Sequence, residues 1–393
     1  MKKVAVVGAG ASGLFCAVEL ALSGCEVELF EQNAKVAKKI LVSGNGRCNI
    51  TNTDAKPSDY YSQNSDFTTY ALDTFNFNEF KKFTSKLGLE LDVKDDGRVY
   101  PLSNEAKSVA SLLLHKALDV GVKLHTDTKI TSIKELKKKF DKVVVATGSE
   151  SASHLGGNRD GLEFAKELGH NIIPTYPSLV QLHLAGDSFK KMSGVKVDAE
   201  VSVLINNKKT TTTSGDVLFT NYGVSGFAIL DASNEISSAL VEYQMVDIVI
   251  NLLPRFTTQK LASHIMKISQ ISPTSTLEDI LHGLVPIKIA KTVLELLKLP
   301  PTMLASELNT KLSKKISNQI SNLKFEVTQT HGFRYAEVAG GGVDTQEINP
   351  KTMESLKEKD FYFCGEVLDV VGRRGGFNFA WAWASAKVCS MSI

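Results

Sequence analysis

Cysteine is scarce in this chain of 393 residues, which contains only five of them: Cys16, Cys25, Cys48, Cys364 and Cys389. Their number is odd, they are scattered, and no two form a Cys-x-x-Cys pair. The pattern therefore indicates neither a disulfide framework nor a zinc site. Because free thiols are typical of a reducing compartment, we expect a cytoplasmic protein without a bound metal.

Long hydrophobic runs are also missing. No apolar stretch approaches the roughly 18 residues that a membrane-spanning helix needs. The first residues carry neither a charged leader nor the apolar core of a signal peptide, so we expect no secretion signal and no membrane partner. With 43% hydrophobic residues, the chain can bury a large core, and its length favours two or three domains.

Net charge is low, at +2, but it is unevenly distributed. Residues 251–325 contain ten lysines and arginines and four acidic residues, so this segment carries +6 and the remainder carries −4. A solvated helical surface is one interpretation of this segment. A surface that binds a polyanion is the other, and the sequence leaves both open.

The strongest motif stands at the start of the chain. Val4–Val7 is an apolar run typical of a buried parallel strand. It leads into a G-x-G-x-x-G sequence and then into a helical pattern over Leu14–Ala21. In such a loop the first glycine permits a tight turn, the second lets the backbone approach a pyrophosphate, and the third lets the helix pack against the strand. These glycines are Gly8, Gly10 and Gly13.

A second predicted strand, residues 27–31, ends at Glu31. An acid at this position accepts hydrogen bonds from a ribose diol, which indicates an adenosine without a 2′-phosphate. The amide groups and dipole at the start of the first helix attract the phosphate charge. The combined context predicts a dinucleotide site rather than a structural glycine turn.

A polar, glycine-rich loop follows at residues 43–52 and includes Arg47 and Cys48. Arg47 can meet a phosphate or the negative charge of a reduced flavin. Cys48 can donate a proton near the cofactor, or it can be a small packed residue. Both roles remain open, although loops close to a nucleotide fold commonly line its site.

Three later segments also bring the backbone close to a dinucleotide. A buried strand ends in Ala146-Thr147-Gly148, a sequence that recurs beside the adenine side of FAD. Another ends in Gly365-Glu366, where the carboxylate can reach the ribityl hydroxyls. Gly375-Gly376 precede an alanine-rich helix whose N-terminus can stabilise charge on a reduced flavin.

The pattern between these segments changes near residue 186. Alternating strands over 186–253 and 323–326 predict an inserted β-domain, either a small barrel or a sandwich. Helical periodicity with proline breaks predicts a helical subdomain over 254–322. The expected fold is therefore an α/β protein whose Rossmann-like, glutathione-reductase-like FAD-binding domain is formed by residues 1–185 and 327–393.

Four blocks of this chain together resemble the BaiN-like (YhiN-type) family of FAD-dependent oxidoreductases: residues 43–52, 218–226, 341–355 and 365–378. The resemblance spans nearly all of the chain. It departs after Gly148, where Ser149-Glu150-Ser151-Ala152-Ser153 stands in place of a glycine and a Ser-Tyr-Pro run, and near Gly157, where Asn158-Arg159 replaces Ser-Thr-Gly.

The resemblance implies an FAD site, which we expect to be lined by residues from both chain ends: Gly8, Gly10, Ala11, Ser12, Gly13, Glu31, Gln32, Lys39, Ser43, Gly44, Gly46, Arg47, Cys48, Asn49, Ala146, Thr147, Gly148, Gly365, Glu366, Asp369, Gly375, Gly376, Phe377 and Asn378. A single dinucleotide fingerprint leaves NAD(P)H as a transient electron donor without a domain of its own. Expected catalytic acids are Cys48 and Tyr222, although Tyr222 can also be a hydrogen-bonded turn residue.

The family implies reduction of an electron-poor C=C bond by hydride transfer from flavin N5 and protonation by an acid. The +6 segment favours ribosomal RNA as partner, with uridine reduced to dihydrouridine. An alternative is NAD(P)H-dependent reduction of a small enone or steroid-like molecule. A further alternative is a flavin-bound RNA-binding or assembly protein without turnover.

Overall fold

The computed structural model describes all 393 residues and divides them into two compact units. The first unit joins Met1–Pro177 to Ala336–Ile393, and the second is Ser178–Tyr335. Both chain ends therefore contribute to the first unit, as the sequence pattern predicts.

A parallel sheet of five strands forms the centre of the first unit, in the order β17-β8-β1-β2-β7. All of its neighbouring strands run parallel. From β1 the strand order extends through β2 to β7 on one side and through β8 to β17 on the other, and α/β sheets bind ligands at such a switch point. The strands are β1 (Lys3–Val7), β2 (Glu26–Phe30), β7 (Lys123–His125), β8 (Lys142–Val145) and β17 (Phe361–Phe363).

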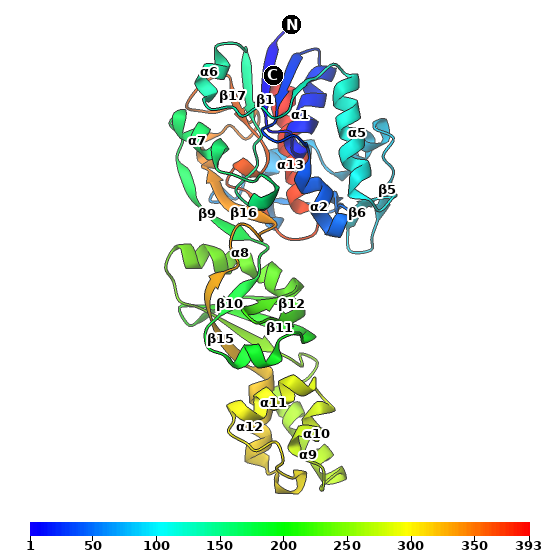
Figure 1. The fold of residues 1–393 in the computed structure, drawn as a ribbon, viewed down its shortest axis with the longest axis vertical. Helices are drawn as coiled ribbons and strands as arrows, with labels where there is room; N and C mark the ends of the chain where they lie inside the picture. Colours follow the sequence, from blue (N-terminus) through cyan, green and yellow to red (C-terminus); the bar gives the residue numbers. More distant parts are fainter. The chain divides into compact units, whose positions relative to one another are not determined.

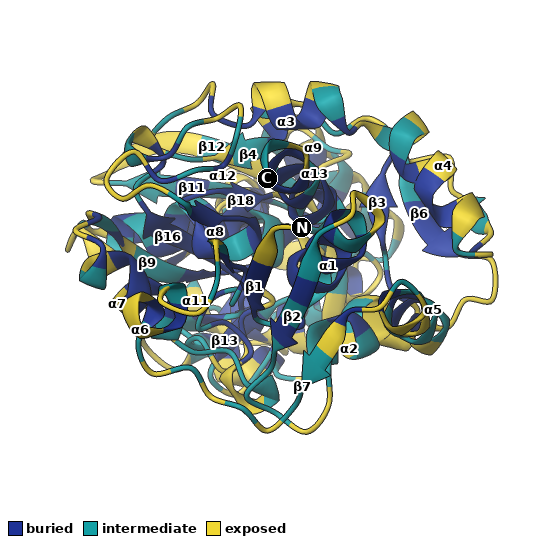
Figure 2. Ribbon diagram, turned by 90° about the horizontal axis from the view of Figure 1, so that it is seen from above, coloured by how far each residue is buried: buried dark blue, intermediate teal, exposed yellow.

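The first and last helices of the chain, α1 (Ala11–Leu22) and α13 (Phe377–Ser392), pack against each other (Figure 1). Helix α13 is buried along most of its length and is drawn largely in dark blue in Figure 2. Its two tryptophans, Trp381 and Trp383, are each 1% exposed, which matches helix packing. The terminal helices thus fix the glycine loop and the last glycine pair in one core.

The other elements of this unit are helices α2 (Lys38–Gly46), α3 (Thr69–Thr74), α4 (Phe77–Lys86), α5 (Ala106–Asp119), α6 (Ile133–Lys137) and α7 (Asp160–Glu167), and strands β3 (Thr51–Asn52), β4 (Tyr60–Tyr61), β5 (Leu91–Val93), β6 (Arg98–Pro101), β9 (Ile172–Ser178), β16 (Val338–Val343) and β18 (Val371–Gly372). Asp96 and Gly97 lie in the turn of the antiparallel hairpin β5–β6. Residues 128–130 follow β7 and form no strand.

The second unit contains a closed barrel in the order β10-β13-β12-β11-β14-β15. Strand β14 alternates buried and half-buried residues, as a barrel wall requires. Strand β10 belongs to this barrel, although the sequence places residues 182–184 in the nucleotide-binding domain. The strands are β10 (Leu182–Leu184), β11 (Lys196–Ile205), β12 (Lys208–Phe219), β13 (Gly223–Ser225), β14 (Val246–Asn251) and β15 (Leu323–Thr330).

Helix α8 (Phe227–Val241) packs on the barrel and was not anticipated from the sequence. Its apolar residues Ala228, Ile229, Ala232 and Ile236 are at most 1% exposed. The predicted helical segment contains α9 (Thr258–Ile271), α10 (Leu277–His282), α11 (Ile287–Leu296) and α12 (Thr310–Ser321). Across the whole structure, every helix is too short or too polar to cross a bilayer.

Candidate cofactor site

The three glycines of the first loop occupy different environments. A Cβ atom at Gly8, whose φ is +105°, would lie 2.5 Å from the Ala146 carbonyl oxygen. A Cβ atom at Gly13 would lie 1.8 Å from the Gly8 carbonyl oxygen. A Cβ atom at Gly10 would meet nothing within 4 Å. Gly8 and Gly13 therefore permit backbone packing, whereas Gly10 borders open space at the start of α1, where Ala11 and Ser12 form the first turn.

Glu31 lies at the end of β2 and turns its carboxylate toward this loop. Its Oε2 accepts a hydrogen bond from the Ala9 amide at 3.0 Å, and its Oε1 accepts from the Asn33 amide at 2.9 Å. The acid predicted to hold a ribose is therefore fixed beside the glycine loop. The neighbouring Gln32 donates from Nε2 to the Gly156 carbonyl at 3.2 Å.

The ends of β1, β8 and β17 come together at one edge of the sheet. Gly8 is adjacent to the Ala146 backbone, and a Cβ atom at Gly365 would lie 2.5 Å from Ser12 Oγ. The close approach at Gly365, whose φ is +78°, explains why glycine stands there. The structure thus brings the first glycine loop, the segment Ala146–Gly148 and the Gly365-Glu366 pair to the same place.

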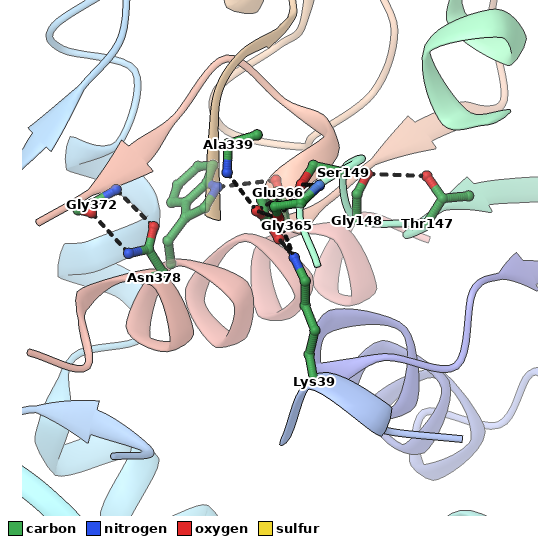
Figure 3. Close-up of polar contacts among 11 residues, drawn as sticks. Lys39, Thr147, Gly148, Ser149, Ala339, Gly365, Glu366, Gly372 and Asn378 are labelled. Atoms are coloured by element: carbon green, nitrogen blue, oxygen red, sulfur yellow. Dashed lines mark hydrogen bonds and ion pairs between the residues drawn. The ribbon is translucent and has the colours of Figure 1, made fainter. Parts of the chain in front are cut away.

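Glu366 is the centre of a polar network at this edge (Figure 3). Its Oε1 accepts hydrogen bonds from Ser149 Oγ at 2.7 Å, Ser151 Oγ at 2.9 Å and the Ala339 amide at 2.9 Å. Its Oε2 accepts from Lys39 Nζ at 2.7 Å. Lys39 was predicted for the cofactor site, whereas the two serines belong to the segment where the sequence departs from the family pattern.

The loop at residues 43–52 holds the glycine pair that precedes α13. Asn52 Nδ2 donates to the Gly375 carbonyl at 2.9 Å. The side-chain oxygen of Asn49, oriented to satisfy its hydrogen bonds, accepts from the Gly376 backbone amide at 3.1 Å. A Cβ atom at Gly376, whose φ is +94°, would lie 2.2 Å from the Thr51 carbonyl oxygen. The two predicted cofactor segments are therefore in direct contact.

The start of α13 is fixed by its own side chains. Asn378 accepts from the Gly372 amide and donates to the Gly372 carbonyl, both at 2.8 Å (Figure 3). Arg373 stacks on the Phe377 ring at 4.5 Å and pairs with buried Asp59 at 2.9 Å. Arg373 and Asp59 were missed, because they carry no motif and meet only in the folded chain. The first amides of α13 have no acceptor within the helix and remain available to a ligand.

Residues of the polar loop have mixed environments. The loop begins inside α2, where Ser43, Gly44 and Asn45 leave helical geometry, and Gly44 and Gly46 both have positive φ. The exposed Arg47 donates from Nε to the Gly44 carbonyl at 3.2 Å and stacks over the Tyr100 ring at 5.3 Å. Its guanidinium therefore already lies against the loop.

Cys48 is fully buried, with a φ of +61°. Its amide donates to the Ser43 carbonyl at 2.9 Å. Burial raises the pKa of the Cys48 thiol to about 12. A thiol enclosed in the core and reluctant to lose its proton favours the packing role over the proton donor.

Two further predicted residues have internal partners. Asp369 is 4% exposed and accepts from the Gln63 amide at 2.9 Å, and burial raises the pKa of its carboxyl group. Thr147 donates weakly from Oγ1 to the Gly148 carbonyl at 3.4 Å. Tyr222 belongs to the second unit, where it stacks on His331. Nowhere does the structure group three His, Cys, Asp or Glu side chains in a way that could hold a metal.

Comparison with known proteins identifies the family. The model of the HI0933-like protein Rossmann domain matches residues 2–392. The chain belongs to this family. It is therefore an FAD-dependent oxidoreductase with a Rossmann-like fold.

Individual relatives cover almost the same length. The 3-dehydro-bile acid delta(4,6)-reductase of Clostridium scindens is 32% identical over 398 residues, covering 98% of this chain and 97% of the relative. The ribosomal RNA dihydrouridine synthase of Haemophilus influenzae is 33% identical over 405 residues, covering 99% and 97%. Among solved structures, 3-ketosteroid delta1-dehydrogenase from Sterolibacterium denitrificans gives a TM-score of 0.48 at 13% identity, with 100% of each chain covered.

The residues at the sheet edge fit FAD. The open space beside Gly10 and the N-terminus of α1 suit a pyrophosphate. Glu31 suits the adenosine ribose and Glu366 the ribityl chain, although Glu366 Oε1 already accepts three hydrogen bonds. Since a carboxylate offers about four acceptor sites over its two oxygens, Oε2 is the atom with room for a cofactor hydroxyl.

Proposed function

We propose that this protein reduces the C=C bond of uridine in ribosomal RNA to give dihydrouridine. FAD, when bound, supplies the hydride that is added to one carbon of the double bond, and a nicotinamide cofactor restores the reduced state. The second carbon needs a proton. Of the two acids suggested by the sequence, we favour Tyr222 over the buried Cys48.

The observation that carries the RNA substrate is the surface of α9 and α12, which pack against each other. Neither helix contains an aspartate or a glutamate. Together they present five exposed lysines, none of which pairs with a carboxylate: Lys260, Lys267, Lys311, Lys314 and Lys315. We call these five residues the lysine surface.

Two other lysines of the same region are neutralised by acids. Lys291 pairs with Glu278 at 3.4 Å, and Lys324 pairs with Asp247 at 2.9 Å. Half of the ten basic residues in 251–325 are therefore lysines on α9 and α12 that pair with no carboxylate. Phosphate neutralisation by unpaired lysines is how proteins hold nucleic acid, and a small-molecule reductase has no need of it.

The decisive experiment is nucleoside mass analysis of ribosomal RNA from cells with and without the gene. We expect dihydrouridine to be lost on deletion and restored by the wild-type gene. Dihydrouridine that is unchanged, or absent from both strains, would refute ribosomal RNA as the substrate.

A charge variant tests the docking surface separately. In Lys314→Gln/Lys315→Gln, we expect weaker RNA binding and a salt dependence of log Kd that is shallower by roughly 0.7–0.9 per lysine lost from the interface. Lys208→Gln/Lys209→Gln on the β11–β12 hairpin removes exposed charge elsewhere in the same unit and is the matched control. Equal effects of both variants would contradict a localised RNA surface.

Reduction of a small conjugated ketone is the second candidate, favoured by the 32% identity to the bile acid reductase over 98% of this chain. The two functions predict different substrates for the reduced enzyme. Reoxidation by a steroid enone that is independent of salt, without reoxidation by ribosomal RNA, would favour the small molecule.

A further inference from the structure

Four ring side chains gather in the second unit where β10, β13 and β15 meet: His183, Tyr222, His331 and Tyr335. The His331 ring stacks on Tyr222 with centroids 4.4 Å apart and an interplanar angle of 22°. It also lies 4.3 Å from the Tyr335 ring, and His183 lies 5.1 Å from Tyr222. We call these four residues the ring cluster.

The two histidines form a hydrogen-bonded pair. His183 Nε2 and His331 Nδ1 are 2.7 Å apart, so one nitrogen donates a hydrogen bond to the other. The outer nitrogens, His183 Nδ1 and His331 Nε2, make no hydrogen bond within the chain. Burial lowers the pKa of His183, and the charge of His331 lowers it further. The two outer nitrogens of the pair are therefore polar atoms that can hydrogen-bond to a ligand.

A second unsatisfied group lies next to the pair. The His331 amide donates to the Gln181 backbone carbonyl at 2.8 Å. The side-chain Oε1 of Gln181 is buried and has no hydrogen-bond partner. Buried acceptors are almost always paired in folded proteins, because an unmade hydrogen bond costs free energy. An acceptor and two free imidazole nitrogens beside one stack indicate a ligand site rather than a packed corner.

The stack is also open at one end. Tyr335 is 51% exposed, although its ring is part of the stack. The Arg334 guanidinium lies 5.9 Å from the centre of the Tyr335 ring. Aromatic rings with an adjacent arginine are the usual platform for a planar ring, including an unpaired base.

We propose that the ring cluster binds a planar, conjugated carbonyl ring, with Tyr335 stacking on the ring and the histidine pair donating a hydrogen bond to its carbonyl oxygen. Uracil and a cyclic enone share this chemistry, so the site suits either candidate substrate. The proposal rests on the reduction of a conjugated C=C bond proposed above. All of the residues that carry it belong to the second unit.

The test measures binding without turnover, on the oxidised FAD-loaded protein with no reductant present. Uridine 5′-monophosphate and a water-soluble 4-en-3-one steroid are titrated separately while histidine Cε1–H resonances are followed by NMR. Histidine→Gln variants assign the resonances. We expect the resonances of His183 and His331 to shift. The resonance of His264, which lies on α9 and stacks on Phe256 just before that helix, should stay unchanged.

Stacking is tested by Tyr335→Ala, which should raise Kd by about tenfold, while Tyr335→Phe should retain the affinity. Tyr243→Ala, at a tyrosine that is 97% exposed in the same unit, is the control and should leave Kd unchanged. A shift caused by the nucleotide alone assigns the site to RNA, and a shift caused by the steroid alone assigns it to a small molecule. Both results support the ring cluster.

Two results would overturn the inference: neither probe moving His183 or His331, or His264 shifting equally. Loss of cellular dihydrouridine on deletion, together with either result, would leave the proposed function standing while removing the ring cluster from it. Binding at the ring cluster with unchanged cellular dihydrouridine would leave the ring cluster standing as a ligand site and would remove ribosomal RNA as the substrate.

Discussion

Adding one methyl group at each of two neighbouring glycines should separate cofactor contact from packing. Gly10→Ala places a Cβ atom where nothing lies within 4 Å, whereas Gly13→Ala places one 1.8 Å from the Gly8 carbonyl oxygen. Gly10 has a φ of −84°, which alanine adopts freely. We therefore expect Gly10→Ala to impair FAD binding without disturbing the fold, and Gly13→Ala to disturb the fold itself.

The magnitudes differ enough to be measured. Overpacking a closely packed site costs about 1–3 kcal/mol, and a 1.8 Å contact with backbone belongs at the upper end. For a unit of this size each kcal/mol lowers Tm by about 2–4 °C, so Gly13→Ala should lose about 6–12 °C. Gly10→Ala should lose less than about 2 °C, because alanine at an N-cap costs about 0.5 kcal/mol.

The assay pairs thermal unfolding of the apoprotein, followed by circular dichroism, with titration of FAD followed by quenching of flavin fluorescence. A methyl group that intrudes on the pyrophosphate should weaken FAD binding by roughly 5- to 150-fold, equivalent to about 1–3 kcal/mol. Wild-type affinity in Gly10→Ala would refute the assignment of the open space to the cofactor. Equal losses of Tm in both variants would refute the packing argument.

Three further outcomes are expected. Ser149→Ala/Ser151→Ala removes two of the three donors to Glu366 Oε1 and should weaken FAD binding in the fluorescence titration, while Ser153→Ala should not. Cys48→Ala should lower the free energy of unfolding by about 1–2 kcal/mol but leave turnover per bound flavin within about twofold; a large loss of turnover would restore Cys48 as the acid. His170, whose pKa is lowered by burial, binds its proton more weakly in the folded than in the unfolded chain. Its contribution to the free energy of unfolding is therefore complete above about pH 6.5 and falls as pH drops below this value. In urea titrations, His170→Gln should therefore flatten the decline of the free energy of unfolding between pH 7 and 5.

The nucleotide-binding core could be predicted from the sequence because its signals are local. The strand ending at Val7, the three glycines and the following helix lie within one short segment, and the steric reason for Gly13 lies in the loop itself, at the Gly8 carbonyl oxygen. The closing block is local in the same sense, since Gly376 directly precedes α13. Such segments adopt one structure in nearly any Rossmann-like context.

Contacts between distant segments could not be predicted in this way. His183 and His331 are separated by 148 residues and meet only because β10 pairs with β15. Barrel register fixes that pairing, and short strands such as Leu182–Leu184 carry little periodic signal of their own. Helix α8 was missed for a related reason: it packs small residues on the barrel, and its serines and asparagine weaken the helical pattern.

The network around Glu366 shows why a departure from the family pattern need not weaken the cofactor site. Ser149 and Ser151 stand where the family has other residues, yet both donate to the carboxylate that the family pattern predicts for FAD. Three donors on Oε1 and one lysine on Oε2 hold a carboxylate whose side chain is 18% exposed. Because hydrogen bonds to a charged acceptor stabilise it by about 1.5–3 kcal/mol each, the position of Glu366 is fixed before any cofactor binds. The two serines thus occupy Oε1 and help to fix the carboxylate, and Oε2 is left as the oxygen with room for a cofactor hydroxyl.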